Sequence, residues 1–326
     1  MEAVLPGDTQ SAAQSSPLAA RAGPVTRRGR WRVAVRLGLV AGLATLTSAC
    51  SAFGLLNAST TIADPGVRVT RDIAYAPGDR HSLDVYTPAH PAPGRPVVVF
   101  LYGGGWDSGA KADYAWVGRA LAAQGFVTVV PDYRLYPEVR WPAFLQDSAE
   151  AVKWTHDHAG DYGGAASRLV LMGHSAGAYN AVELAVDGRW LKAVGMDPNR
   201  DVAGVVGLSG PYDFLPLHSD ELKTIFGPED QRPDTQPINH VDGHAAPMLL
   251  ITGDSDHTVD PGNSDRLAAK ITAAGGQVRV IHYPKLDHAR TVAALAPPLR
   301  FLAPVMREVS AFVRERAAAT PAAPAG

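Results

Sequence analysis

Short apolar runs alternate with longer amphipathic stretches between about residues 67 and 318. Eight of the runs have the length and the β-branched content of strands, and they cover residues 67–75, 83–86, 97–102, 127–130, 169–172, 204–208, 248–252 and 278–283. Stretches with helical spacing cover residues 112–124, 143–158, 176–186, 263–274 and 302–316. Apolar strands that alternate with helices indicate a mainly parallel sheet with helices on both faces. The pattern therefore predicts one α/β domain over residues 67–318.

The first fifty residues differ in charge from the rest of the chain. Six arginines and two acids give them a net charge of +4, whereas the whole chain carries −2 and the remainder therefore −6. The last of these arginines, Arg36, is followed by an apolar run over residues 37–46 and by three small residues before Cys50. This order is typical of a bacterial export signal. We expect residues 1–50 to be a signal peptide and the protein to be exported.

Cys50 stands where such a signal would be cut, and it is the only cysteine of the chain. Residues 46–50 resemble the lipobox of bacterial lipoproteins, with Thr47 where that family usually has an aliphatic residue. The resemblance implies a diacylated Cys50 that anchors the protein to a membrane of the cell envelope. An ordinary signal peptide cleaved nearby, with a secreted or periplasmic product, is the alternative.

Composition excludes several other classes of protein. The apolar run of the leader is shorter than the roughly 20 residues of a membrane span, and no later run is longer, which excludes a polytopic membrane protein. Without further cysteines the domain depends on core burial and not on disulfides. Its mildly acidic balance offers no basic stripe for nucleic acid. Residues 51–66 are predicted to be a small, polar tether, and the Pro/Ala-rich residues 319–326 a disordered tail.

Residues 173–177, Gly-His-Ser-Ala-Gly, directly follow a predicted strand and open a predicted helix. In this context the G-x-S-x-G pattern indicates a nucleophile elbow, where glycines allow a sharp turn that lifts the serine hydroxyl above the sheet. Ser175 is therefore the candidate nucleophile. His174 lies inside the motif, where a side chain usually points away from the reaction, so we interpret it as structural.

A serine hydroxyl needs a base within hydrogen-bond reach, and the base needs an acid to orient it. In hydrolases with this elbow the acid and then the histidine follow the serine along the chain. His288 comes after the last predicted strand and is the candidate base. Three carboxylates, Asp254, Asp256 and Asp260, share the preceding loop, and spacing alone leaves the choice among them open.

Three successive glycines, 103–105, follow the predicted strand that ends at Tyr102. Such a run costs backbone entropy and is tolerated where the main chain must approach another group closely. We expect the N–H groups of Gly104 and Gly105, with that of Ala176, to form an oxyanion hole for an acyl-transfer transition state.

These motifs together resemble those of the hormone-sensitive-lipase-like esterases, and more closely the bacterial feruloyl-esterase-like (BD-FAE) and kynurenine-formamidase-like branch of the α/β-hydrolase superfamily. The resemblance covers roughly residues 67–313 and rests on segments 102–111, 132–138, 142–147, 173–177 and 209–213 together with the acid and histidine loops. It implies an α/β-hydrolase fold with a minimal cap. It is far less specific for the substrate.

Related hydrolases place the acid three positions after the loop glycine, which implies Asp256, with Asp254 as the alternative. The chain departs from the wider family at Tyr102, where a histidine usually pins the oxyanion loop, and we expect the tyrosine hydroxyl to replace that hydrogen bond. The family's 132–135 segment is usually structural. Trp106 and Tyr179 are candidates for the acyl pocket, although aromatic residues near an elbow are as often part of the core.

The function expected from these residues is hydrolysis of short-chain carboxylic esters through an acyl-enzyme on Ser175, without a cofactor or a metal. The histidines lack the spacing of a metal motif. An arylformamidase-like amide hydrolase is the enzymatic alternative, and a non-catalytic envelope protein on a hydrolase scaffold is the other. We expect a small-molecule or polymer-linked ester as the substrate, while oligomeric state is left open.

The expected acyl length follows from what surrounds the core fold. The residues before Val67 are a signal and a tether, and the proline-rich insertion over residues 209–247 reads as a shallow wall and not as a helical lid. Because each methylene contributes about 0.8 kcal/mol only where it is buried, we expect acyl groups of up to about six carbons.

Overall fold

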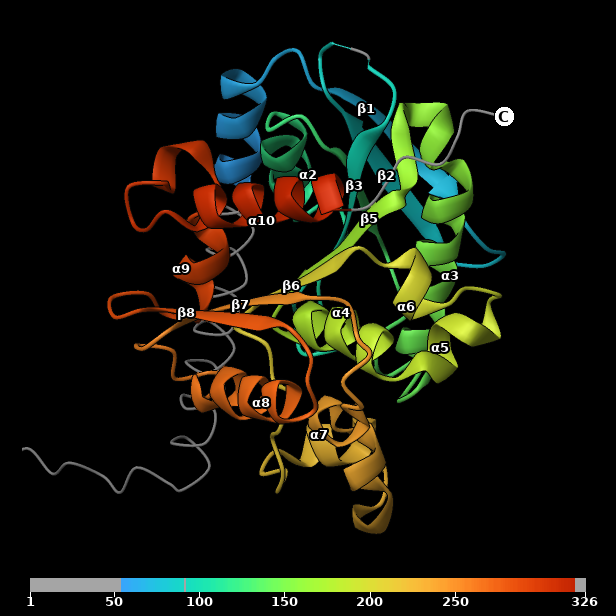
Figure 1. The fold of residues 1–326 in the computed structure, drawn as a ribbon, viewed down its shortest axis with the longest axis vertical. Coiled ribbons are helices and arrows are strands. Elements are labelled where there is room, and N and C mark those ends of the chain that lie inside the picture. The colour runs from blue at the N-terminus through green and yellow to red at the C-terminus, as the bar shows by residue number, and fades with distance from the viewer. Residues whose placement is uncertain (1–53, 91, 320–326) are drawn as a thin grey trace, which may run out of the picture. The chain divides into compact units, whose positions relative to one another are not determined.

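One mixed sheet organises the part of the chain that the structure describes. The computed structural model describes residues 54–90 and 92–319, so the predicted signal, Cys50 and residues 320–326 lie outside it. Eight strands follow the order β1-β2-β4-β3-β5-β6-β7-β8 (Figure 1). The β1–β2 and β2–β4 pairs are antiparallel, and every pair from β4 to β8 is parallel. The prediction of an eight-stranded, mostly parallel sheet is confirmed.

The strands lie close to their predicted positions. They are β1 (Arg68–Ala74), β2 (Ser82–Thr87), β3 (Arg95–Leu101), β4 (Val127–Pro131), β5 (Gly164–His174), β6 (Gly204–Leu208), β7 (Met248–Gly253) and β8 (Val278–Tyr283). The longer helices are α2 (Ala115–Ala122), α3 (Ala143–His158), α4 (Ala176–Val186), α8 (Gly262–Ala273) and α10 (Val305–Ala319). Sequence reasoning missed four short helices: α5 (Gly188–Ala193), α6 (Pro198–Asp201), α7 (Asp220–Ile225) and α9 (His288–Ala293).

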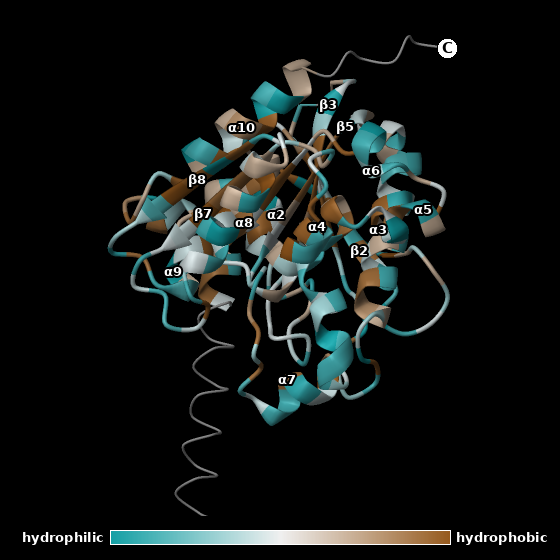
Figure 2. Ribbon diagram, turned by 60° about the horizontal axis from the view of Figure 1, so that its bottom comes forward, coloured by the Kyte–Doolittle hydropathy of each residue, from teal (hydrophilic) through white to brown (hydrophobic). Residues whose placement is uncertain are grey.

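The central strands are apolar along their whole length because both of their faces are covered. All residues of β4, β6 and β7 are buried, whereas the edge strand β1 is mostly exposed. Figure 2 shows the apolar strands enclosed by helices whose outer surfaces are polar. Such burial is typical of parallel strands and explains why they appear in the sequence as continuous runs.

Helices form a layer on each side of the sheet (Figure 1). α2 packs on β2, β3 and β4, and α10 packs on β5, β6 and β7. α3 and α4 pack on the opposite face, where α4 covers β5 and β6. The β5–α4 turn, which contains the serine motif, thus lies at the centre of the sheet at the carboxyl ends of its parallel strands.

The insertion between β6 and β7 contains more helix than expected. In addition to α7 it forms two 3₁₀ segments, η2 (Glu229–Thr235) and η3 (Pro237–His240). The prolines explain why these pieces stay short, since proline lacks the N–H that a helix interior requires. Sequence reasoning expected a shallow wall in place of a helical lid and did not place these short helices; among the described residues no long helix of the insertion covers the site.

The predicted tether over residues 51–66 is ordered in its described part. Residues 54–63 are helical. The Asn57 side chain donates to the carbonyl of Ala112 at 3.0 Å and accepts from the N–H of Trp116 at 2.8 Å, which holds this helix against the start of α2. Residues 54–63 of the predicted tether are therefore helical and make specific contacts with the domain.

The ends of the domain differ slightly from the predicted bounds. α10 continues through Ala319, one residue beyond the predicted end of the domain.

Among the described residues no helix has the length and apolar content needed to cross a membrane.

Candidate active site

The serine motif forms a strained turn between β5 and α4. Ser175 has φ 55° and ψ −123°, a conformation that residues with a side chain rarely adopt. A Cβ on Gly177 would lie 2.0 Å from the carbonyl oxygen of Leu101, and one on Gly173 would lie 2.1 Å from that of Gly177. Only glycine fits at both positions, so the motif spacing is a direct consequence of close backbone packing.

His288 and Asp256 meet although 32 residues separate them in the sequence. Nδ1 of His288 lies 2.8 Å from Oδ2 of Asp256, whose other carboxylate oxygen accepts from the N–H groups of Thr258 and Val259 at 2.9 Å. Burial alone would raise the pKa of Asp256, but these hydrogen bonds outweigh it and lower the pKa below its ordinary value. An ionised Asp256 favours the tautomer with hydrogen on Nδ1, which leaves Nε2 free to accept a proton.

The two other loop acids have different partners. Oδ1 of Asp254 lies 2.7 Å from Nδ1 of His282 on β8, and Asp265 is hydrogen-bonded to the other nitrogen of the same ring. Asp260 accepts from the N–H of Gly262 and pairs with Arg266 at 3.1 Å. The geometry thus places Asp256 with His288 and leaves Asp254 and Asp260 in separate ion pairs.

His174 connects the serine turn to the histidine loop, a role that sequence reasoning did not find. Its Nε2 donates to the backbone carbonyl of His288 at 3.0 Å, and the two rings lie 4.8 Å apart. Burial, with a contribution from the charge of His288, lowers the pKa of His174 to about 3. The ring therefore stays neutral and supports His288 as a hydrogen-bond donor. Nothing in the motif pattern indicated this contact, because it joins segments 114 residues apart.

The glycine loop after β3 packs against the serine turn. A Cβ on Gly103 would lie 2.9 Å from that of Ser175, and Gly104 and Gly105 have φ values of 135° and 61°. Gly105, Ser175 and Ala176 line the same cleft. The glycine loop, the serine turn and Ala176, which the sequence predicts to form one site, are therefore adjacent in the fold.

Tyr102 anchors this loop through its hydroxyl. The hydroxyl donates to Oδ1 of Asp132 at 3.0 Å and accepts from Nη2 of Arg80 at 2.6 Å. Tyr133, which follows Asp132 in the chain, donates to the carbonyl of Tyr102 at 2.7 Å. Burial raises the pKa of Asp132, although hydrogen bonds from Lys111 and Tyr102 oppose the effect. The tyrosine thus makes the kind of hydrogen bond expected of it, and residues 132 and 133 support the loop.

The cleft beside Ser175 has a volume of about 580 Å³, within the ordinary range for small-molecule sites. Trp106, Phe214 and Leu222 contribute apolar lining, whereas Asp213 and Arg266 line it with an ion pair. Phe214 and Leu222 come from the insertion after β6, and sequence reasoning missed their contribution. Tyr179, by contrast, is fully buried and donates to the carbonyl of Thr235, so it belongs to the core.

The fold and the site can now be compared with known proteins. Residues 83–271, more than half of the chain, match the BD-FAE family. This chain belongs to the BD-FAE family. The predicted resemblance to this group is confirmed.

Relatives of this BD-FAE chain include proteins named as esterases. The probable isoprenylcysteine alpha-carbonyl methylesterase ICMEL1 of Arabidopsis thaliana is 29% identical over 257 residues, which cover 71% of this chain and 53% of the relative. Esterase LipC of Mycobacterium tuberculosis is 28% identical over 275 residues, 75% of this chain and 67% of its own. The chain spans between half and three fifths of the length of the plant methylesterases that it matches.

Solved structures support the fold. A truncated carbohydrate esterase from gut microbiota has a TM-score of 0.65 at 23% identity, covering 77% of this chain and 96% of its own. An inhibited esterase B from Lactobacillus rhamnosis has a TM-score of 0.67 at 20% identity, covering 85% and 97%. The α/β-hydrolase fold predicted for this BD-FAE chain is thus confirmed.

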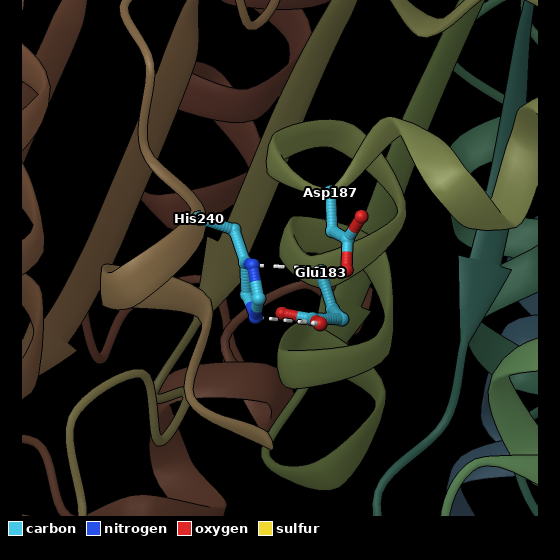
Figure 3. A group of neighbouring side chains, drawn as sticks. All are labelled: Glu183, Asp187 and His240. Carbon is cyan, nitrogen blue, oxygen red and sulfur yellow. Dashed lines mark ion pairs between the residues drawn. The ribbon is translucent and has the colours of Figure 1, made fainter. Parts of the chain in front are cut away.

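A second group of titratable residues lies at the far end of α4. Figure 3 shows His240 of η3 facing Glu183 and Asp187, at 3.9 and 3.8 Å. Such residues can bind a metal, but Arg189 already supplies a cation, since it pairs with Asp187 and with Asp234 at 2.9 Å. The arrangement is a charge network built around one arginine, and it carries no metal assignment.

Glu183 is fully buried within this network. Burial, reinforced by the nearby Asp187 charge, raises the pKa of Glu183 to about 8. Trp190 donates to one carboxyl oxygen at 3.4 Å, and the other has no hydrogen-bond partner among the described residues. The folded protein therefore binds a proton here that the unfolded chain, with an ordinary carboxyl pKa, releases near pH 4.5.

A stability measurement tests this raised pKa. Because the folded state holds the extra proton, Glu183 lowers the free energy of unfolding as pH rises from 4.5 to above 8, by up to roughly 5 kcal/mol. Glu183→Gln places a neutral amide of the same shape at this position. Its free energy of unfolding in urea should therefore match that of the wild type at pH 5 and exceed it at pH 9. Glu150→Gln, at an exposed position of α3, is the control and should leave the free energy of unfolding unchanged at both pH values. Parallel wild-type and Glu183→Gln pH curves would contradict the raised pKa.

Proposed function

We propose that this BD-FAE chain is a serine carboxylesterase with Ser175 as nucleophile, His288 as base and Asp256 as orienting acid. The observation that carries the proposal is the His288–Asp256 pair at 2.8 Å. The backbone of His288 is bonded to His174, the residue before a serine in the strained conformation of a nucleophile elbow. The esterase names of the relatives support the same reaction class. The chemistry requires no cofactor.

In this proposal the serine hydroxyl attacks the ester carbonyl while Nε2 of His288 accepts its proton. Asp256 stabilises the imidazolium and keeps its own charge throughout. N–H groups of Gly104, Gly105 and Ala176 receive the developing oxyanion. The imidazolium then protonates the departing alcohol, and a water molecule, deprotonated by the same histidine, hydrolyses the acyl-enzyme to release the acid.

The substrate class we propose is a short-chain ester. Apolar lining near Ser175 is supplied by Trp106 and Phe214, whose rings stack with centroids 6.2 Å apart. The same lining contains Arg266, which pairs with Asp213 and Asp260, and an alkyl chain cannot be buried favourably against these charges. A few methylenes can therefore be buried, but a long chain cannot.

We also propose that the protein is exported and retained at the cell envelope through an acylated Cys50. The support comes from the basic, apolar and small-residue order of residues 21–50. Acyl chains contribute about 0.8 kcal/mol per buried methylene, so two or more chains give stable anchoring.

Neutralising each loop acid tests the assignment of the triad. In a comparable triad, loss of the nucleophile costs about a millionfold in turnover and loss of the acid about ten-thousandfold. Ser175→Ala and Asp256→Asn should therefore lose nearly all kcat on p-nitrophenyl butyrate, whereas Asp254→Asn and Asp260→Asn should lose far less. Circular dichroism and unfolding curves check that each variant folds. Greater damage from Asp254→Asn would overturn the acid assignment.

An acyl-length series tests the substrate class. The kcat/KM on p-nitrophenyl esters should be highest at acetate or butyrate and decline beyond about six carbons, since further methylenes are not buried. Phe214→Ala should lower the value for butyrate more than for acetate, because it removes apolar wall. A maximum at palmitate would contradict the proposal. Faster turnover of N-formyl aromatic amides than of aryl esters would favour the formamidase alternative.

Mass spectrometry of the mature N-terminus tests the anchor. The expected product begins at Cys50 with a diacylglyceryl group on its sulfur, and Cys50→Ser should prevent both modification and membrane retention. An unmodified N-terminus at another residue would remove the lipid anchor and leave export by an ordinary signal peptide.

A further inference from the structure

The helix over residues 54–63 packs Leu56 against the core but exposes two other large apolar side chains to water. Its polar side chains Asn57 and Thr60 point inward: Asn57 bonds to the start of α2, and Thr60 is fully buried with its hydroxyl on the carbonyl of Leu56. Leu55 and Ile62, seven residues apart and so on one side of the helix, are 72% and 81% exposed. The helix has no charged residue. A helix between a protein core and water normally shows the opposite arrangement.

A third exposed apolar side chain lies close to this helix. Of the large apolar side chains in residues 54–90 and 92–319, three are exposed, and the third is Phe301 at 80%. Its neighbour Arg300 interacts electrostatically with Asp64, which directly follows the helix. Figure 1 shows the helix, in blue, beside the red segment that precedes α10. Exposed apolar residues scattered singly need no explanation, but here all three gather on two adjacent segments.

A cationic groove adjoins Phe301. It runs along α10, and its lining includes Arg300, Arg307 and Arg314 but no acidic residue of the described chain. Arg307 and Arg314 are seven residues apart and therefore share one side of the helix. Arg307 also pairs with Glu308, and Arg314 donates to the carbonyl of Gln124. Net positive charge beside apolar side chains is the combination that a bilayer with anionic headgroups attracts.

We propose that Leu55, Ile62 and Phe301, with the arginine groove, form a surface that docks the domain onto an anionic lipid bilayer. The inference rests on the proposed acylation of Cys50, which is four residues before the helix begins. Four residues span at most about 14 Å, so an acyl anchor brings this helix to the headgroup layer. None of these residues lines the cleft beside Ser175.

Fluorescent labels on the full chain test the docking surface. Ile62→Cys and Phe301→Cys would each be labelled with NBD, with Lys192→Cys on α5 as the exposed control. On phosphatidylglycerol vesicles the labels at 62 and 301 should shift to the blue and be quenched by doxyl-labelled lipids, whereas the control label should not. Esterase activity on a soluble ester should stay unchanged, which shows that the variants fold.

A second pair of variants separates docking from anchoring. In the chain with the label at 301, Leu55→Glu and Ile62→Glu together should return the label's emission to its value in water, although the anchor remains. Arg307→Gln with Arg314→Gln, or zwitterionic vesicles, should weaken the shift, because the headgroup attraction is lost. If the shift is unchanged both in the variant without the two arginines and on zwitterionic vesicles, the arginines have no role in docking.

Two outcomes would overturn the proposal as a whole. Labels at 62 and 301 that remain as solvent-exposed as the control on vesicles would show that the surface faces water. A blue shift already present without lipid, with a dimer in light scattering, would show that the surface binds a second copy of this chain. If mass spectrometry finds Cys50 unmodified, the same labels in a Cys50→Ser background with added vesicles test docking independently of the anchor.

Discussion

The site depends on a backbone contact between β3 and the turn from β5 into α4. At Gly177 the main chain of α4 lies so close to the end of β3 that a Cβ would meet the Leu101 carbonyl oxygen at 2.0 Å. This approach fixes Ser175 in a conformation with positive φ and places the glycine loop against it. Close packing in a rigid sheet overdetermines the turn, which is how a protein maintains local strain at a functional position.

Buried polar contacts then connect the loops around that turn. Tyr102 joins the glycine loop to Asp132 and Arg80, and His174 joins the serine turn to the backbone of His288. Each contact joins a side chain of one loop to a group far away in the sequence. Because buried hydrogen bonds are costly to leave unmade, these contacts restrict the loops to one mutual arrangement.

The polarity of the surface changes from one side of the molecule to another. Most helices carry hydrophilic residues on their outer sides, as Figure 2 shows, whereas the helix over residues 54–63 exposes Leu55 and Ile62 and buries Thr60. Its small polar residues gave the appearance of a tether in the sequence. Only the contacts with α2 reveal that Asn57 faces the domain, while Leu55 and Ile62 are left outside.

The sequence by itself determined the strands, the long helices and the serine turn, because these depend on local periodicity and on glycine spacing. β6 and β8 and the helices α3 and α4 begin and end at the predicted residues. Local pattern could not choose among three aspartates on one loop, or find His174's contact, or identify which side of a short polar helix is buried. Those features are decided by pairs of residues tens of positions apart, such as His288 and Asp256, and only the tertiary structure brings them within hydrogen-bond distance.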